Sequence, residues 1–118
     1  MPFRERFRHA RQTAAARETR GLVAVPPDPS GGELHLIGST KCIHINRSIL
    51  APIFGIPPGA LRLTEVDVGG GFGARGELYP EDILIPLAAM KLGRPVKWTE
   101  TRRENLMAAN HAREGTWQ

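Results

Sequence analysis

The spacing of hydrophobic and polar positions changes several times along the chain. Two short runs, LVAV at residues 22–25 and ELHLIG at residues 33–38, are rich in strand-forming residues and flank the turn sequence PPDPSGG. This pattern predicts two strands joined by a turn. LRLTEVDV at residues 61–68 alternates in the manner of a third strand, and PVKWT at residues 95–99 predicts a fourth.

Three other segments follow a helical period. In residues 44–55, isoleucines recur every fourth position at Ile45, Ile49 and Ile53, and a glycine follows as a stop signal. Residues 80–93 begin with a proline and two acidic residues and end at a glycine, which are typical helix boundaries. Residues 102–110 predict a short last helix. The order β-β-α-β-α-β-α indicates the α/β class (mixed α+β), with helices packed on a mixed sheet.

A glycine-rich loop separates the third predicted strand from the second long helix. The stretch DVGGGFGARG, residues 67–76, holds five glycines in ten residues. Glycine clusters lose much conformational entropy on folding, so they usually mark a backbone that turns tightly or approaches a ligand closely. Three interpretations are open at this point: a nucleotide phosphate site, a site for another cofactor, and a structural loop anchored on the core by Phe72.

The nucleotide interpretation rests on GFGARG, Gly71 to Gly76, which matches the dinucleotide-binding pattern G-x-G-x-x-G. Glu100, near the end of the following strand, stands where a ribose-binding carboxylate belongs. The match has a physical fault, because three residues separate Gly76 from Pro80 and the proline removes an amide that the phosphate would need. We therefore expect no NAD or FAD binding, and a small nucleotide-binding domain stays as an alternative.

The net charge belongs to the N-terminal end. Residues 1–20 carry six arginines and two glutamates, a balance of +4, and the remaining residues are neutral overall. A weak helical stripe of apolar residues runs through the same segment (Phe3, Phe7, Ala10 and Ala14). We interpret residues 1–20 as a solvated basic arm and residues 21–118 as a partial domain. An arm that binds an acidic partner would instead indicate a non-catalytic interaction protein.

Composition excludes several classes of protein. No apolar run approaches the roughly 20 residues of a membrane span, and residues 1–21 lack the apolar core of a signal peptide. The single Cys42 rules out an internal disulfide and a cysteine-based zinc cluster, and it suits a reducing cytoplasm. We expect no membrane or nucleic-acid partner. His35 and His44 show no metal-ligand spacing.

Two further candidates near the C-terminus receive a structural interpretation. We interpret His111 and Arg113 as surface residues on or after the last helix. Trp98, in the middle of the fourth predicted strand, is expected in the core rather than in a ligand platform.

The sequence from VGGGFGARGELYP to NHAR resembles the molybdopterin-binding large subunit of the xanthine dehydrogenase, aldehyde oxidase and carbon monoxide dehydrogenase family. That family has a strand followed by GGGFG and a basic residue, then a helix and GRPVKW. Upstream, ETRG at residues 18–21 and IGSTKCIH at residues 37–44 resemble the entry segment and the SSTQ-x-PH turn. SILAPIFGIPPGALRL matches the link between that turn and the glycine loop, so the resemblance covers nearly all of residues 18–115, in order.

The resemblance implies a molybdenum–molybdopterin cofactor against Gly70, Gly71, Phe72 and Gly73, whose backbone amides would face the ligands of the metal. Glycines let several amides crowd one anion without collisions of Cβ atoms. Lys41 takes the position of the family's glutamine, and a lysine donates hydrogen bonds but accepts none. Its charge would strengthen the contact or redirect it to a pterin phosphate. We expect Lys41 at the end of the second strand, on the side of the glycine loop.

The implied activity is oxidative hydroxylation of an aldehyde or N-heterocycle. The implied partners are the remaining large-subunit domains, iron–sulfur and flavin subunits or modules, and a small-molecule substrate. Xanthine-type members carry a substrate-binding glutamate just past the loop, where this chain has Gly76 and then Glu77, so a purine is not expected. The family's glutamate base comes from a later domain. We therefore expect a fragment without catalytic or metal-ligating residues, which neither binds the cofactor nor turns over substrate by itself.

Overall fold

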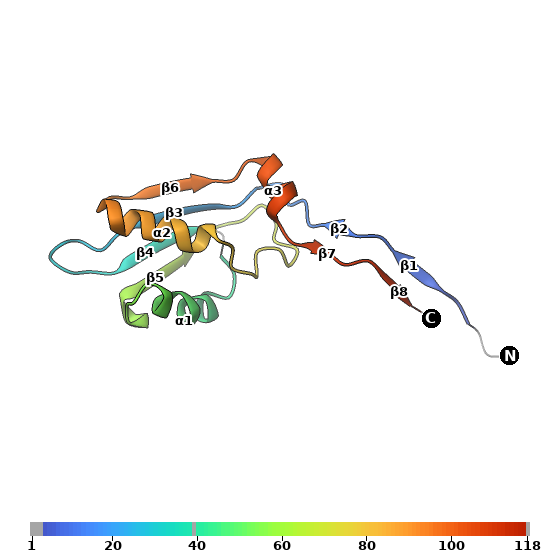
Figure 1. Cartoon of the computed structure of the whole chain (residues 1–118), viewed down its shortest axis with the longest axis horizontal. Helices are drawn as coiled ribbons and strands as arrows, with labels where there is room; N and C mark the ends of the chain where they lie inside the picture. Colours follow the sequence, from blue (N-terminus) through green and yellow to red (C-terminus); the bar gives the residue numbers. More distant parts are fainter. Residues whose placement is uncertain (1–3, 39, 118) are drawn as a thin grey trace.

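The computed structural model describes residues 4–38 and 40–117. A four-stranded sheet in the order β5-β4-β3-β6 forms its centre (Figure 1). The strands are β3 (Gly21–Val25), β4 (Leu34–Gly38), β5 (Leu61–Glu65) and β6 (Val96–Thr99). β3 pairs antiparallel with β4 and β6, whereas β4 and β5 are parallel. The sheet is therefore mixed, and the predicted fold class is confirmed.

Two helices, α1 (Ile43–Ile53) and α2 (Glu81–Leu92), pack on one face of this sheet. Alternate strand residues point to the same face of a sheet, and the buried core joins such residues to both helices. Its members are Leu22, Ala24, Leu34, Leu36 and Leu61 from the strands, Leu50 and Ala51 from α1, and Ala89 from α2. A short turn of 3₁₀ helix, η1 (Pro58–Ala60), leads into β5, and α3 (Arg102–Ala108) follows β6. The core is thus a single layer between sheet and helices.

The boundary signals that predicted α2 are confirmed, and the predicted short last helix forms as α3. Pro80 precedes the first turn of α2, and Gly93 ends the helix in the left-handed conformation with φ 60°. α3 begins with a capping box, in which the Thr101 side chain accepts from the Glu104 amide and the Glu104 side chain accepts from the Thr101 amide. Trp98 packs against the core, as expected.

The isoleucine stripe that predicted α1 faces solvent. Ile45, Ile49 and Ile53 are exposed, whereas Asn46 and Leu50 are buried against the sheet. The buried Asn46 side chain donates to Thr40 Oγ1 and to the carbonyl oxygen of residue 41 at 2.8 and 2.7 Å, which fixes the start of the helix. The period therefore predicted the helix correctly but not the face that it buries.

The N-terminal arm forms strands, so the predicted helical stripe is wrong. β1 (Phe7–His9) pairs antiparallel with β8 (Gly115–Trp117), and β2 (Gln12–Thr13) pairs with β7 (His111–Ala112). The arm has too few apolar residues to bury one face of a helix against the domain. As a strand, the arm instead forms backbone hydrogen bonds with the extended C-terminal segment. The side chains of β1 and β2 are exposed, and Phe3 of the stripe lies outside the described residues.

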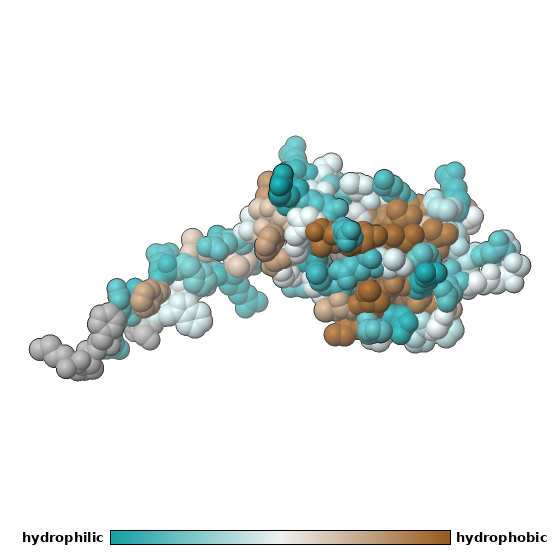
Figure 2. All heavy atoms as spheres, turned by 180° about the vertical axis from the view of Figure 1, so that it is seen from behind, coloured by the Kyte–Doolittle hydropathy of each residue, from teal (hydrophilic) through white to brown (hydrophobic). Residues whose placement is uncertain are grey.

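These two strand pairs form a narrow ribbon that projects from the globular part, with both termini at its far end (Figure 1). The molecule measures 74 × 28 × 22 Å as a result. Figure 2 shows broad apolar patches on the globular part and a mostly hydrophilic ribbon. Among the described residues, no helix is long and apolar enough to cross a membrane.

Candidate functional site

The glycine loop after β5 has an irregular backbone with several left-handed residues. Gly70 and Gly73 have φ angles of 110° and 86°, which confirms the expectation that at least one loop glycine has a positive φ. Phe72 also has a positive φ, 48°, a conformation that a bulky residue adopts only when its surroundings enforce it. The loop is therefore a shaped turn and not a continuation of the strand.

The loop presents a run of unpaired backbone donors. The amides of residues 70–73 have no hydrogen-bond acceptor within the described part of the chain. On either side of this run the amides are paired, because Gly69 donates to Glu18 Oε2 at 2.7 Å and Ala74 donates to the Gly71 carbonyl at 3.0 Å. Adjacent free amides in an irregular, left-handed turn are typical of backbone that binds an anion.

Lys41 lies beside this run, as its expected position requires. A Cβ atom built on Gly71 would be 3.5 Å from Lys41 Cε, and the Lys41 amide donates to the Arg75 carbonyl at 3.4 Å. The Lys41 ammonium is 3.6 Å from Glu65 Oε1, and both side chains are partly exposed. Such an exposed ion pair contributes about 0–1 kcal/mol to stability, so the Lys41 ammonium can leave Glu65 at little cost. The role of Lys41 in cofactor binding stays a prediction.

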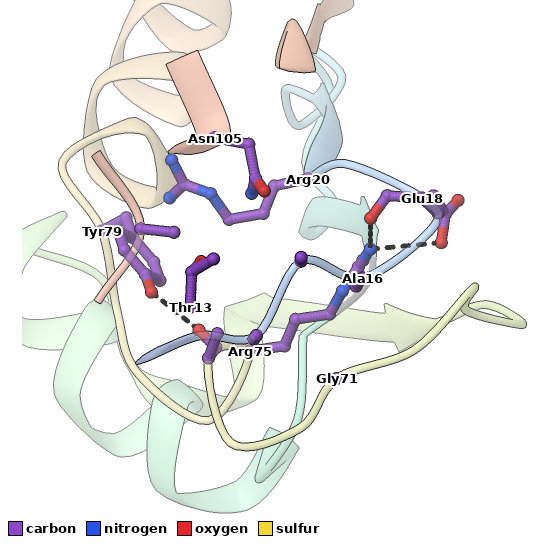
Figure 3. A pocket seen from close by; sticks show the side chains of 12 residues that line it. Thr13, Ala16, Glu18, Arg20, Gly71, Arg75, Tyr79 and Asn105 are labelled. Atoms are coloured by element: carbon purple, nitrogen blue, oxygen red, sulfur yellow. Dashed lines mark hydrogen bonds and ion pairs between the residues drawn. The ribbon is translucent and has the colours of Figure 1, made fainter. Parts of the chain in front are cut away.

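A buried arginine holds the loop from behind. Arg75 Nη2 donates to the carbonyls of Glu18 and Thr19 at 2.7 and 3.1 Å and lies 3.4 Å from the Glu18 carboxylate. Figure 3 shows the Arg75 side chain reaching toward Glu18, which also accepts from the loop at Gly69. A Cβ atom on Gly69 would come within 2.6 Å of Glu18 Cβ, so this close approach requires a glycine.

A second buried charge cluster ties β3, α2 and α3 together. Arg20 donates to Glu100 Oε1 from Nε at 3.0 Å and from Nη2 at 2.5 Å, and its Nη1 lies 3.3 Å from Glu81. Glu100 Oε2 accepts from the Arg20 amide at 3.0 Å and from Asn105 Nδ2 at 2.8 Å. The guanidinium carbon of Arg20 is 3.7 Å from the ring centroid of Tyr79, a cation–π contact. Every oxygen of Glu100 is thus committed to the fold.

This cluster removes the basis of the dinucleotide interpretation. The Glu100 side chain is 0% exposed and bonded to Arg20, so it is unable to reach a ribose. At the start of α2, the amides of Asp82 and Ile83 already donate to the carbonyls of Tyr79 and Pro80 at 3.0 and 3.1 Å. No feature of residues 4–38 and 40–117 therefore supports the nucleotide alternative.

A groove of about 520 Å³ lies in front of the loop, between the loop and the β2–β7 pair. The Phe72 side chain lines it and is 77% exposed, so the interpretation of a structural loop anchored on the core by Phe72 is wrong. Across the groove, Asn110 Nδ2 donates to the Glu77 carboxylate. His111, expected on the surface, lies half-buried in β7, and its Nε2 has no partner among the described residues. The groove therefore combines an aromatic face with polar groups.

The buried cluster predicts an acid-sensitive fold. Burial alone would raise the pKa of Glu100, but hydrogen bonds from Arg20 and Asn105 outweigh burial and hold that pKa below its ordinary value. A carboxyl with a lowered folded pKa stabilises the fold above its unfolded pKa of about 4.3 and loses this contribution as pH falls through the folded pKa. Burial raises the pKa of Asp82, so protonation of Asp82 opposes this trend.

We therefore expect the free energy of unfolding, measured by urea titration from pH 7 to pH 3, to fall less steeply below pH ~4.3 in Glu100→Gln than in the unmodified chain. Asp82 contributes equally to both chains, and hydrogen bonds from Thr101 hold the pKa of Glu104 below its ordinary value in both, so the difference between their slopes reports mainly Glu100. Equal slopes would contradict the assignment of the lowered pKa.

Sequence reasoning missed the residues that hold the site in place: Glu18, Arg20, Arg75 and Asn105. Charged side chains are usually exposed, and no period or spacing marks which of them pair inside a fold. One signal could have pointed to three of these residues. Glu18 and Arg20 lie in ETRG and Arg75 lies in GARG, and both stretches belong to the motifs that carry the family resemblance.

Comparison with known proteins places this geometry in a family. A protein-family model described as a molybdopterin cofactor-binding domain matches residues 1–118. The chain is 37% identical over 112 residues to the 6-hydroxypseudooxynicotine dehydrogenase complex subunit gamma of Paenarthrobacter nicotinovorans, covering 95% of this chain and 14% of that protein. It is 39% identical over 108 residues to the nicotine 6-hydroxylase large subunit of the same organism, covering 92% and 13%.

A solved structure shows the same fold. The reconstituted CO dehydrogenase from Oligotropha carboxidovorans superposes with a TM-score of 0.86 at 34% identity, over 93% of this chain and 14% of that chain. The chain thus spans 13–14% of the length of these relatives. The family, its molybdopterin cofactor and the mixed sheet agree with what the sequence motifs implied. The chain belongs to the molybdopterin cofactor-binding domain family.

Proposed function

We propose that the glycine loop and Lys41 form one wall of the molybdopterin site in a molybdenum hydroxylase large subunit. The observation that carries this proposal is the run of amides from Gly70 to Gly73, which find no acceptor among the described residues and lie beside a lysine ammonium. Several adjacent unpaired donors suit a ligand with many anionic oxygen and sulfur atoms.

The residues at this wall fit such a ligand. The left-handed glycines keep the backbone free of Cβ atoms at the point of approach. The charge of Lys41 is balanced by Glu65 at 3.6 Å, so the pair adds a donor without adding net charge. The glutamine that the resemblance places at this position is also uncharged. The Lys41–Glu65 pair therefore resembles that glutamine in net charge and in offering a hydrogen-bond donor.

When bound, the cofactor would supply the oxidative chemistry, and this chain would supply the hydrogen-bond donors that orient it. The amides of residues 70–73 orient the cofactor by donating hydrogen bonds, and Lys41 adds a movable donor at one edge. The groove in front of the loop offers the exposed ring of Phe72 to a flat substrate and the Glu77–Asn110 pair to its polar edge. An aldehyde or N-heterocycle is the proposed substrate class, supported by the nicotine hydroxylase among the relatives.

Hydroxylase activity is proposed for a large subunit that contains this domain, because the chain spans 13–14% of its relatives. The proposed partners are the other large-subunit domains and iron–sulfur and flavin modules. The relatives named as a complex subunit and as a large subunit support this assembly. The single cysteine, Cys42, is an exposed free thiol, which supports a reducing, cytoplasmic location.

A titration of the 118-residue chain with molybdopterin cofactor, released anaerobically from a purified molybdenum enzyme, tests the proposed wall. The sequence motifs led us to expect no cofactor binding by this chain alone, but the unpaired amides of residues 70–73 change that expectation. We propose weak, saturable binding that Lys41→Ala lowers about 10-fold, because one charge-assisted hydrogen bond is lost. Lys91→Ala, an exposed lysine on α2, is the matched control and should bind like the unmodified chain.

A parallel titration with NAD should give no specific binding. Equal affinity of Lys41→Ala and the unmodified chain would contradict the role of Lys41. Saturable, specific NAD binding by the unmodified chain would restore the nucleotide alternative.

A further inference from the structure

We infer that Arg75 is the positioning residue of the glycine loop: its buried guanidinium holds the loop from behind so that the amides of residues 70–73 stay turned toward the ligand. This inference rests on the proposed function only where it concerns the ligand. Arg75 acts through the neighbouring backbone and through Glu18, not by touching the cofactor.

The contacts of Arg75 join three segments of the chain. Its side chain is 3% exposed, and Nη2 donates to the carbonyls of Glu18 and Thr19 at 2.7 and 3.1 Å. Its own carbonyl accepts from the Lys41 amide at 3.4 Å. One residue thus fixes the entry to β3, the loop and the segment that carries the lysine of the proposed site.

Glu18 passes this constraint on to the start of the loop. The Glu18 carboxylate lies 3.4 Å from Arg75 Nη2 and accepts from the Gly69 amide at 2.7 Å. The Glu18 amide donates back to the Gly69 carbonyl at 3.4 Å. Gly69 is therefore held from both sides immediately before the first unpaired amide of the loop.

The charge of Arg75 is incompletely neutralised. Glu18, which is half-exposed, is its ion-pair partner within the described chain, and Arg75 Nη1 is buried without an acceptor there. Arg75 lines a small cavity behind the loop, and its Cβ lies 4.0 Å from the position of a Cβ on Gly71 (Figure 3). Burying a poorly paired charge is costly, and such departures from local rules concentrate at functional sites. Here the charge lies next to the loop whose unpaired amides we propose to bind an anion.

Backbone ¹⁵N relaxation of the 118-residue chain tests the inference without any ligand. We expect order parameters near 0.85 for residues 70–73 in the unmodified chain and below about 0.6 in Arg75→Met, with the sheet unchanged. Arg75→Lys should recover most of the order, because an ammonium can still donate to the Glu18 and Thr19 carbonyls. Arg94→Met, which replaces an exposed arginine, is the matched control.

Unchanged loop order in a folded Arg75→Met would overturn the inference. If Arg75→Met does not fold, Glu18→Gln replaces it, because this change weakens the link to Gly69 and leaves the backbone carbonyls in place. We expect lower order at residues 69–71 in Glu18→Gln, and unchanged values would overturn the inference equally.

The cofactor titration separates this inference from the proposed function. Weakening of binding by about 10-fold in Arg75→Met supports the ligand part of the inference. Affinity equal to that of the unmodified chain would overturn that part. A mobile loop in Arg75→Met, combined with no cofactor binding by the unmodified chain, would leave Arg75 as the positioning residue and refute the proposed function.

Discussion

Replacing Glu100 by alanine will lower the free energy of unfolding by about 3–5 kcal/mol, because it leaves Arg20 buried without its main counter-charge. Arg20 loses two side-chain hydrogen bonds and one from its amide, and Asn105 loses its acceptor. Glu81, 3.3 Å from Nη1, compensates only partly. Urea denaturation monitored by circular dichroism measures the change.

Two variants control this result. Glu33→Ala removes an exposed carboxylate and should change the free energy of unfolding by no more than about 0.5 kcal/mol. The double variant Arg20→Met, Glu100→Leu should recover much of the lost stability, since replacing both members of a buried ion pair with apolar residues is often neutral. A loss below 1 kcal/mol in Glu100→Ala alone would show that the cluster does not hold the elements together.

Gly69→Ala will destabilise the fold by about 1–3 kcal/mol, the usual cost of overpacking. The new Cβ would lie 2.6 Å from Glu18 Cβ and 3.1 Å from the Glu18 amide nitrogen, so the loop and the entry to β3 must separate. The same separation weakens the hold of Glu18 on the loop, and we expect cofactor affinity to fall with stability.

Gly59→Ala is the matched control for this variant. A Cβ on Gly59 meets no atom within 4 Å, so the substitution should be neutral or slightly stabilising. Urea denaturation of both variants provides the comparison. Equal stability of Gly69→Ala and Gly59→Ala would contradict the close packing of the loop against Glu18.

Local signals made the central fold predictable. Pro80 and Gly93 mark the ends of α2 because their own backbone preferences act there, whatever lies elsewhere in the chain. The positive φ angles of Gly70 and Gly73 follow from the same local freedom. The four sheet strands and three helices were therefore predicted in the correct order.

Features that depend on distant partners were not predictable. The strands of the arm exist because residues 111–117 lie beside them, and nothing within residues 1–20 encodes that pairing. The face that α1 buries also depends on residues outside the helix. Asn46 is buried because Thr40 Oγ1 and the carbonyl oxygen of residue 41 accept its hydrogen bonds. The division of the chain at residue 20 stays a prediction, although Arg20 itself is buried within the domain.

The candidate site divides in the same way. Lys41 and the loop glycines came from motifs that resemble a known family, and the structure places the Lys41 side chain beside Gly71. The support of the loop by Arg75 was hidden, because only the folded chain places residue 75 beneath residues 18 and 19. The resemblance thus indicated which residues to propose as the ligand wall, and the hydrogen bonds of Arg75 carry the inference about what holds the loop.

The proposed wall is tested most directly by amide chemical shifts of the ¹⁵N-labelled chain during titration with anaerobically released molybdopterin cofactor. We expect the amides of Gly70, Gly71, Phe72 and Gly73 to shift and saturate together with that of Lys41. The glycines of the β3–β4 turn, Gly31 and Gly32, lie far from the loop in sequence and should not move. Saturable shifts at the turn without shifts at the loop, or no saturable shift anywhere, would contradict the account.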